Sequence, residues 1–328
     1  MKKLIRAAAA MVATSALLLS FTSRAADYPT QPVKIVVPTS AGGPMDVFAR
    51  ALALRLGEEF KQSFVVDNRT GASEILGAQA VASARPDGYT LLVSTESALM
   101  FNQFMFTKLP YNAEKDLAPV SLAATGPLVM VVPASLQVNS LAEFVALART
   151  RGASKPLSYG SSGIGGVLHL PMVTLAKTNG LELTHVPYRG AAPAIQDMLG
   201  GQLDAAWVGA AGAVPYVRDG RLKALVIGGT TRLGLLPNTP TFSETGIASE
   251  RSDFLYGITA PAGTPPEILD KLAAAVKKIV TDRSFREQNM DPFGYVPAGT
   301  SPEEFKRFLS KDRPIQEQRL KTAGVKPE

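Results

Sequence analysis

The hydrophobic residues of this chain form short β-branched runs separated by stretches with helical spacing. Val33–Val37 is a continuous apolar run, and Pro44–Phe60 follows it with apolar side chains on one helical face and proline in the first turn. Trp207 lies in another such run and is expected in the core. Further strands are predicted near residues 64–66, 89–94, 128–132, 157–159, 183–186, 205–208 and 222–227. Helical patterns lie between them, and this alternation predicts an α/β fold with mostly parallel sheets.

Several helix ends carry recognisable signals. Ser140 with Glu143 forms the pattern of a capping box, and Ser301 opens a second one near the end of the chain. Pro171 lies within the helical pattern of residues 167–178. Because proline lacks an N–H group and clashes with the preceding turn, it should kink that helix or delay its start.

The first residues predict a secretory signal peptide. Residues 1–6 carry three positive charges, residues 7–21 form an uncharged apolar run, and small residues follow to Ala26. The run of about 15 residues is shorter than the roughly 20 that a membrane-spanning helix needs, which disfavours a retained anchor. We therefore expect a signal peptide at residues 1–25, cleavage after Ala25 and export to the periplasm.

Composition narrows the classes of function. Without cysteine, the chain has no disulfide, thiolate metal site, cysteine nucleophile or lipoprotein anchor. Four of the 34 basic residues leave with the signal peptide, so 30 basic residues face 28 acidic ones. No basic run marks a nucleic-acid site. No later segment is long and apolar enough to span a bilayer, so we expect a soluble mature chain.

The length of the mature chain suggests two domains. Because no flexible linker separates them, the chain should cross between the domains more than once. We expect one lobe from residues 26–124 and 252–328 and the other from residues 125–251. The predicted architecture is a clamp, in which each lobe is a mostly parallel sheet flanked by helices and a ligand cleft lies between the lobes.

Two strand-to-helix loops are candidates for anion binding. The first loop precedes the helix at Pro44 and consists of Thr39, Ser40, Ala41, Gly42 and Gly43. Backbone N–H groups at a helix start are unpaired and the helix dipole is positive there, so a carboxylate is stabilised. The second loop is also rich in glycine and contains Ser161, Ser162 and Gly163. Taken singly, each loop could be a plain turn, but facing lobes would hold an anion between two helix starts.

Enzymatic and metal sites find little support. The chain has no P-loop and no G-x-S-x-G motif, and Leu168 replaces the third glycine of a dinucleotide-binding pattern. A serine hydrolase using Ser161 or Ser162 would need a base, and the two histidines, His169 and His185, are expected to be structural. No metal-binding motif occurs. We therefore expect no enzymatic activity, no cofactor and no metal.

Short motifs along the mature chain resemble those of the Bug-type substrate-binding proteins of tripartite tricarboxylate transporters. Any one motif is weak, but their common order is specific. They are Tyr28-Pro29 with Pro32, Val36-Val37-Pro38 with Ala41-Gly42-Gly43 and Asp46, Asn68-Arg69 with Gly71-Ala72, Pro86-Asp87-Gly88-Tyr89-Thr90, Gly160 to Gly163 with His169-Leu170, His185 to Gly190, Gly201-Gln202-Leu203-Asp204, Leu236-Pro237 with Pro240-Thr241, and Ala260 to Pro265.

The resemblance implies a monomeric clamp that closes on one small organic acid and delivers it to integral-membrane permease subunits. It also implies that backbone N–H groups, hydroxyls and water hold the ligand carboxylates, with no buried arginine. Carried over by position, the ligand contacts are Thr39 to Gly43, Ser94, Thr95 and Ser97 in the first lobe, and Ser161, Ser162, Gly163, Gly209 and Ala210 in the second. A role as a ligand-sensing adaptor for a membrane sensor stays open, because docking surfaces leave no motif.

Two places depart from the family's pattern. Ser73 and Glu74 follow Gly71-Ala72, where the family usually has a glycine pair and asparagine. Gly209 stands where many members have an aspartate that pairs with the ammonium of an amino-acid ligand. We therefore expect a plain carboxylate, aromatic or of medium length, unless water or Glu96 replaces that aspartate.

Overall fold

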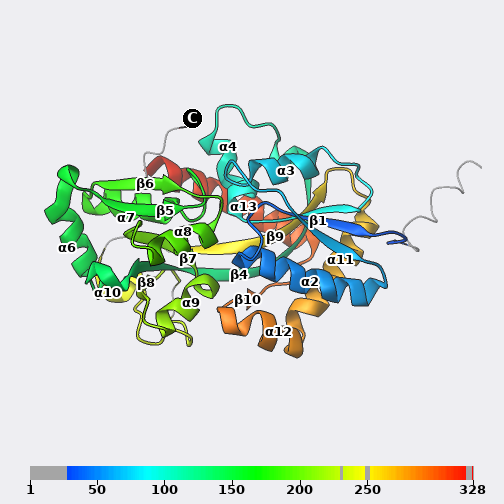
Figure 1. Ribbon diagram of the computed structural model, residues 1–328. Coiled ribbons are helices and arrows are strands. Elements are labelled where there is room, and N and C mark those ends of the chain that lie inside the picture. Colours follow the sequence, from blue (N-terminus) through cyan, green and yellow to red (C-terminus); the bar gives the residue numbers. More distant parts are fainter. Residues whose placement is uncertain (1–27, 230–231, 248–251, 323–326, 328) are drawn as a thin grey trace, which may run out of the picture.

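The computed structural model of the protein describes residues 28–229, 232–247, 252–322 and 327. The predicted signal peptide and its cleavage point after Ala25 lie outside these residues. Among the described residues, no helix is long and apolar enough to cross a membrane. The chain folds into an elongated α/β molecule with two lobes, which share one mixed sheet of ten strands (Figure 1).

The first lobe is built on three parallel strands. β1 (Val33–Val37) lies between β2 (Phe64–Asn68) and β3 (Thr90–Ser94), all close to their predicted positions. β9 (Asp253–Pro261) pairs antiparallel with β3. The other elements of this lobe are α2 (Pro44–Phe60), α3 (Ile75–Ala82), the π-helix η2 (Ser97–Phe101), α4 (Asn102–Met105), α5 (Ala113–Asp116), α11 (Pro266–Thr281), α12 (Arg283–Asn289), the 3₁₀-helix η5 (Asp291–Phe293), β10 (Val296–Pro297) and α13 (Pro302–Thr322).

The second lobe repeats this arrangement with different strands. β5 (Leu157–Ser161) lies between β6 (Leu183–Pro187) and β7 (Ala205–Gly209) and is parallel to both. The other elements of this lobe are the 3₁₀-helix η3 (Ala134–Leu136), α6 (Leu141–Arg151), the 3₁₀-helix η4 (Gly152–Ser154), α7 (Leu170–Asn179), α8 (Ala191–Leu199), α9 (Ala210–Arg218), β8 (Leu222–Ile227) and α10 (Phe242–Thr245). The sequence placed each of the four strands within two residues of its observed ends.

One long strand joins the lobes. β4 (Leu117–Pro133) pairs antiparallel with β9 as far as Pro127 and with β7 and β8 from Leu128 onward. The sequence predicted only residues 128–132 of this strand and missed β9, and the antiparallel pairing of these two strands makes the sheet mixed. The prolines at 119 and 127 and the glycine at 126 hid the first part, because such residues are rare inside strands. The predicted lobe boundaries near residues 124 and 252 stay a prediction.

The capping boxes and the proline effect that the sequence predicted can be compared with the helix ends of the structure. Ser301 and Glu304 form the predicted capping box, since each accepts the backbone N–H of the other. At the start of α6, Ser140 accepts the N–H of Glu143, but the Glu143 carboxylate accepts the N–H of Asn139, so that predicted box is incomplete. α7 begins at Leu170, and the proline in its first turn delays the helix without kinking it.

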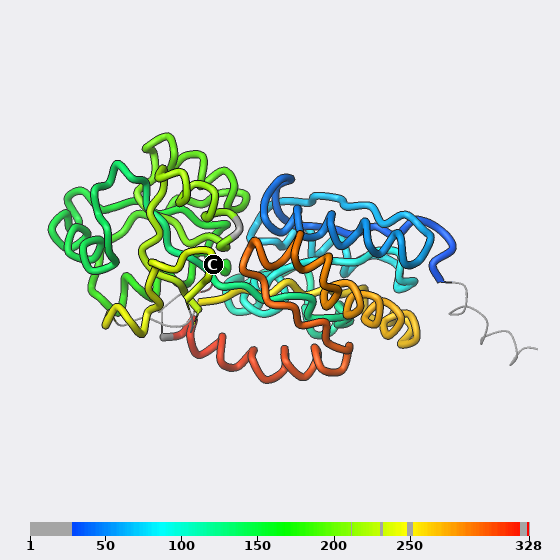
Figure 2. The backbone as a smooth tube through the Cα atoms, turned by 90° about the horizontal axis from the view of Figure 1, so that it is seen from below, coloured from blue at the N-terminus to red at the C-terminus, as the bar shows by residue number. Residues whose placement is uncertain are grey.

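The hydrophobic core runs through both lobes. Trp207 of β7 is fully buried beside Phe242, which confirms its predicted place in the core. One cluster of buried side chains extends from the strands of the first lobe along β4 into β5 and β7. α13 runs along the lower edge of the view in Figure 2 and reaches from the first lobe toward the second. The loops between the lobes are thus carried by a continuous packed scaffold.

Candidate functional site

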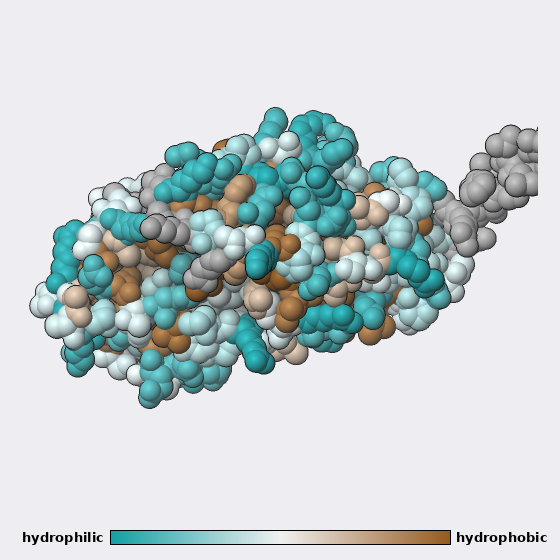
Figure 3. Space-filling model, turned by 90° about the horizontal axis from the view of Figure 1, so that it is seen from above, coloured by the Kyte–Doolittle hydropathy of each residue, from teal (hydrophilic) through white to brown (hydrophobic). Residues whose placement is uncertain are grey.

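A cavity of about 60 Å³ lies between the lobes, where β1, β3, β6 and β7 end. A wider recess of about 630 Å³ adjoins it and shares part of its lining, including Ser40, Glu74 and Gly190. The outer surface is mostly polar, with separate apolar patches along the middle (Figure 3). The cavity is lined by Thr39, Ser40, Gly43, Pro44, Met45, Glu74, Thr95, Leu128, Ser162, Val167, Leu168, Gly190, Ala191, Ala192, Gly209, Phe254 and Tyr256.

The first lobe presents the start of α2 to this cavity. Gly43 is the N-cap with extended backbone, Pro44 takes the first helical position, and Met45 follows on the cavity wall. Proline fits this position because its fixed φ suits a helix start and its missing N–H has no partner there anyway. The first-turn N–H groups of a helix lack acceptors within the helix, so they can bind an anion.

A buried carboxylate fixes the loop that leads into α2. Asp46 is 2 % exposed and accepts hydrogen bonds from Gly42 N–H (2.8 Å), Arg50 Nε (2.9 Å) and Asn68 Nδ2 (2.9 Å). Asn68 also donates to Thr39 O. Burial alone would raise the pKa of Asp46, but these three hydrogen bonds outweigh it and lower the pKa. The carboxylate therefore holds both ends of the first loop.

The second lobe presents the start of α8, which the sequence did not predict to face the ligand. Gly190 is its N-cap with φ 137°, a conformation that favours glycine, and Ala191 and Ala192 follow on the cavity wall. α9 begins one residue after Gly209, which also lines the cavity. Helix starts from opposite lobes therefore meet at one cavity, although the helix behind the second glycine-rich loop is not one of them.

Among the described residues, three hydrogen bonds link loops of the two lobes around the cavity through a serine of the first lobe. Ser40 Oγ donates to Arg189 O (3.0 Å), and Ser73 Oγ donates to Ile164 O (3.0 Å). Ser97 Oγ accepts from the backbone N–H of Val167 (3.0 Å). All three partners in the second lobe are backbone groups, so the contacts fix the spacing of the lobes and describe a closed clamp.

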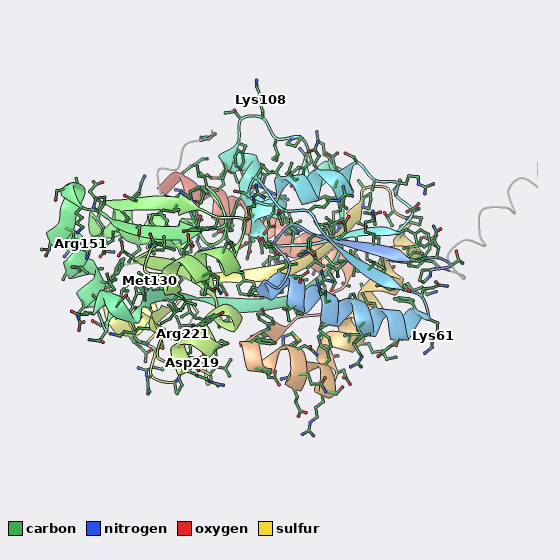
Figure 4. The ribbon with its side chains drawn as sticks, in the orientation of Figure 1. Lys61, Lys108, Met130, Arg151, Asp219 and Arg221 are labelled. Atoms are coloured by element: carbon green, nitrogen blue, oxygen red, sulfur yellow. The ribbon has the colours of Figure 1, made fainter. Side chains whose placement is uncertain are left out.

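The described walls of the cavity carry no positive side chain, whereas Arg189 lines the adjoining recess. Among the described residues that line the cavity, none is lysine, arginine or histidine, and Glu74 is the acidic one. The basic residues labelled in Figure 4, among them Lys61, Lys108 and Arg151, lie at the periphery of the molecule. An anion in this cavity would have to be held by peptide N–H groups and hydroxyls.

A histidine lies next to the first serine of the second loop. His185 Nε2 is 2.7 Å from Ser161 Oγ, which corrects the expectation that no base is oriented toward this serine. Ser161 is 1 % exposed, accepts the N–H of Gly163 and is absent from the cavity wall. His169 Nδ1 accepts the N–H of Gly165 and does not contact the serine. Both histidines thus hold the backbone of the loop.

We expect the two histidines to make the fold sensitive to mild acid. Burial lowers the pKa of His185 to about 4, and burial together with His185 lowers that of His169 to about 3. As the pH falls below about 6.5, the unfolded chain gains protons that the folded chain does not. The free energy of unfolding should fall by about 2 kcal/mol for each histidine between pH 7 and pH 5. Denaturant titrations of the protein and of His185→Asn measure this, and an equal fall in both would contradict it.

A match to a protein-family model identifies the family of this protein. The model described as the receptor of the tripartite tricarboxylate transporter family matches residues 48–322. The chain belongs to this family. The resemblance inferred from the short motifs is therefore confirmed, and the family consists of receptors that work with a membrane transporter.

Relatives and solved structures cover nearly the whole receptor. A UPF0065 protein of Bordetella bronchiseptica is 34 % identical over 93 % of this chain and 89 % of its own length. The structure of Rpa4515 of R. palustris with adipate has a TM-score of 0.88 at 32 % identity and covers 92 % of this chain and 100 % of that one. MatC of Rhodopseudomonas palustris with bound malate has a TM-score of 0.84 at 29 % identity, with 89 % and 100 % covered. These likenesses confirm the fold class.

The predicted contact residues of this receptor are only partly brought together. Six of them line the cavity, namely Thr39, Ser40, Gly43, Thr95, Ser162 and Gly209, and Gly163 lines the wider recess. Ala41 is exposed outside both, and Gly42 lines another pocket beside α8 and α9. Ser94, Ser97, Ser161 and Ala210 are buried behind the walls. For all of these predicted contact residues, a role in ligand binding stays a prediction.

The walls include residues that sequence reasoning missed in this receptor. Gly190, Ala191 and Ala192 follow a strand and precede a proline, which is the same order of residues as at Gly43-Pro44 and could have pointed to α8. Phe254 lies on β9, a strand that the hydrophobic pattern did not predict. Glu74 was noticed only as a departure from the family.

Proposed function

We propose that this protein is an exported solute receptor that captures a small organic carboxylate between its lobes. The ligand then passes to the membrane subunits of a tripartite tricarboxylate-type transporter. The observation that carries the proposal is the pair of helix starts, α2 and α8, which line one cavity from opposite lobes. Two dipoles aimed at the same space stabilise an anion there without a cationic side chain.

The ligands of similar structures support a carboxylate. Adipate and malate are bound by Rpa4515 and MatC. The proposal places the carboxylate of this protein's own ligand against the N–H groups of Met45 and Ala192, within reach of the Ser40 and Ser162 hydroxyls. Closure through Ser40 and Ser73 would then exclude water and strengthen each hydrogen bond. The mature protein works as a monomer in the periplasm and catalyses no reaction.

A thermal-shift screen tests the proposal. The mature chain from Ala26 is unfolded and refolded to remove bound ligand, then heated with mono-, di- and tricarboxylates, aromatic acids and amino acids. A ligand at about 100 times its Kd should stabilise the fold by roughly 2.7 kcal/mol, a rise of several degrees. A rise with one acid class and no product after incubation supports the receptor. No rise with any acid, from protein that is folded and empty, would contradict it and favour the sensor adaptor.

A further inference from the structure

Glu74 is placed in the cavity by a strained turn. Ala72, Ser73 and Glu74 have φ angles of 46°, 50° and 75°, so three consecutive residues with side chains adopt the left-handed conformation. That conformation costs an ordinary residue roughly 1–2 kcal/mol, and it persists mainly where the surroundings impose it at functional sites. Glu74 is 7 % exposed and lines both the cavity and the adjoining recess.

The neighbours of Glu74 are arranged for a carboxylate. Thr95 N–H donates to Oε2 (3.1 Å) and Thr95 Oγ1 donates to Oε1 (2.7 Å). Thr95 Oγ1 also accepts the N–H of Ser97 (3.2 Å), which leaves its own proton for Glu74. The backbone of Ala98 supplies a further hydrogen bond that favours the charged form. Each carboxyl oxygen of Glu74 is therefore an acceptor.

Among the described residues of the cavity wall, no side chain supplies a countercharge for this carboxylate. Arg189 lines the adjoining recess, but it is not among the groups that shift the pKa of Glu74. Burial, and to a smaller extent the charge of Glu74, raises the pKa of both Tyr111 and Tyr256, so both phenols are neutral. Burial raises the pKa of Glu74 to about 7, against the hydrogen bonds of Thr95 and Ala98. An isolated carboxylate in such a place is unfavourable unless a cation joins it. Glu96, the other buried glutamate of this region, lines a separate cavity beside α13.

We propose that the ligand carries a cationic nitrogen as well as its carboxylate, and that Glu74 binds this nitrogen. The proposal rests on the proposed function, because the ligand carboxylate is placed at the starts of α2 and α8. Between the two charged ends, the walls formed by Met45, Leu168 and Phe254 are apolar and suit a hydrocarbon segment. Glu74 thus pairs with the cationic nitrogen of the ligand, as an aspartate at position 209 would, but from a different wall of the cavity.

The sign of the proton exchange on binding distinguishes this ligand from a dicarboxylate. An ammonium group binds the charged form of Glu74, so binding releases protons near pH 7 and should become roughly tenfold tighter between pH 6 and pH 8. A second carboxylate requires the protonated form, so binding takes up protons and weakens over the same range. Both signs follow from a titration centred near pH 7.

Calorimetry on the refolded mature protein measures both affinity and proton exchange, through buffers of different ionisation enthalpy. The probes are matched pairs in which an ammonium replaces one carboxylate, adipate with 6-aminohexanoate and succinate with 4-aminobutanoate, together with the tightest acid of the thermal screen. The variant Glu74→Gln removes the charge at nearly constant shape. Glu96→Gln is its control, because that glutamate is equally buried but lies outside this cavity.

We expect the amino acid of a pair to bind more tightly than the dicarboxylate and to release protons. In Glu74→Gln its affinity should fall at least tenfold and lose its pH dependence, while Glu96→Gln behaves like the parent protein. Tighter binding of the dicarboxylate with proton uptake would overturn the inference and leave the receptor function intact. Absence of binding by every acid would instead overturn the proposed function. If Glu74→Gln does not fold, the number of protons that the unmodified protein releases or takes up on binding still tests the inference.

Discussion

The substitution Gly163→Ala should weaken ligand binding at least tenfold while both lobes stay folded. Gly163 has φ 122°, and a Cβ added there would lie 2.3 Å from Ser73 Oγ in the opposite lobe. Real Cβ atoms do not approach another atom so closely, so the Ser73 hydroxyl must turn away or the lobes must stay further apart. In either case the hydrogen bond from Ser73 to Ile164, which links the two lobes, is lost. Calorimetric titration with the acid found in the thermal screen measures the change.

Two further variants separate this clash from simple backbone strain. Ser73→Gly removes the hydroxyl that meets the new methyl group, so the double variant should regain part of the affinity. Gly180→Ala is the matched control, because Gly180 has φ 63° in the same lobe and nothing lies within 4 Å of its added Cβ. It should lose about 1 kcal/mol of stability and keep its affinity. Equal loss of binding in Gly163→Ala and Gly180→Ala would show that closure is not the cause.

Asp46→Ala should lower both stability and affinity. The variant removes three hydrogen bonds to a buried carboxylate, which costs about 2 kcal/mol in the free energy of unfolding. It also frees the loop between Thr39 and Gly42, so ligand binding should weaken at least tenfold. Denaturant unfolding and calorimetry measure the two effects. Glu58→Ala on the outer face of α2 removes an exposed ion pair with Arg55 and should change neither by much.

The same carboxylate should contribute to acid unfolding. Because the pKa of Asp46 is lowered in the folded state, its contribution to stability is present above the unfolded pKa of about 3.9. It is lost as the pH falls through the folded pKa, since the folded chain must then take up a proton that the unfolded chain already holds. Asp46→Asn removes this loss, so its stability should decline less than that of the parent protein below pH 4. Parallel declines would contradict the assignment.

The sequence predicted those parts of the fold where hydrophobic pattern and local chemistry agree. β1 and α2 were placed to the residue, because a compact apolar run ends at a proline and a helix with proline in its first turn follows. β4 was placed only in part, because its first half contains proline and glycine and is held by pairing with β9. Such pairing joins residues more than a hundred positions apart, and no local pattern reports it.

The site was predicted to a similar extent. The start of α2 could be foreseen, because the glycines and the proline that form it are neighbours in the sequence. The opposing helix start could not, since two loops of the second lobe had the required character and only the packing of the lobes selects Gly190 over Gly163. The approach of His185 to Ser161 likewise depends on the parallel pairing of β5 with β6.

A cavity lined by peptide dipoles and hydroxyls has a consequence for how the receptor responds to its surroundings. Dissolved ions screen long-range attraction between exposed charges, with a Debye length of roughly 8 Å at 0.15 M, but they screen buried charges much less. Capture that relied on surface lysines or arginines would slow as salinity rises. Here the positive ends of α2 and α8 act only within the closed clamp. The receptor should therefore keep its affinity across wide changes in ionic strength, as suits a compartment that exchanges salts freely with the medium.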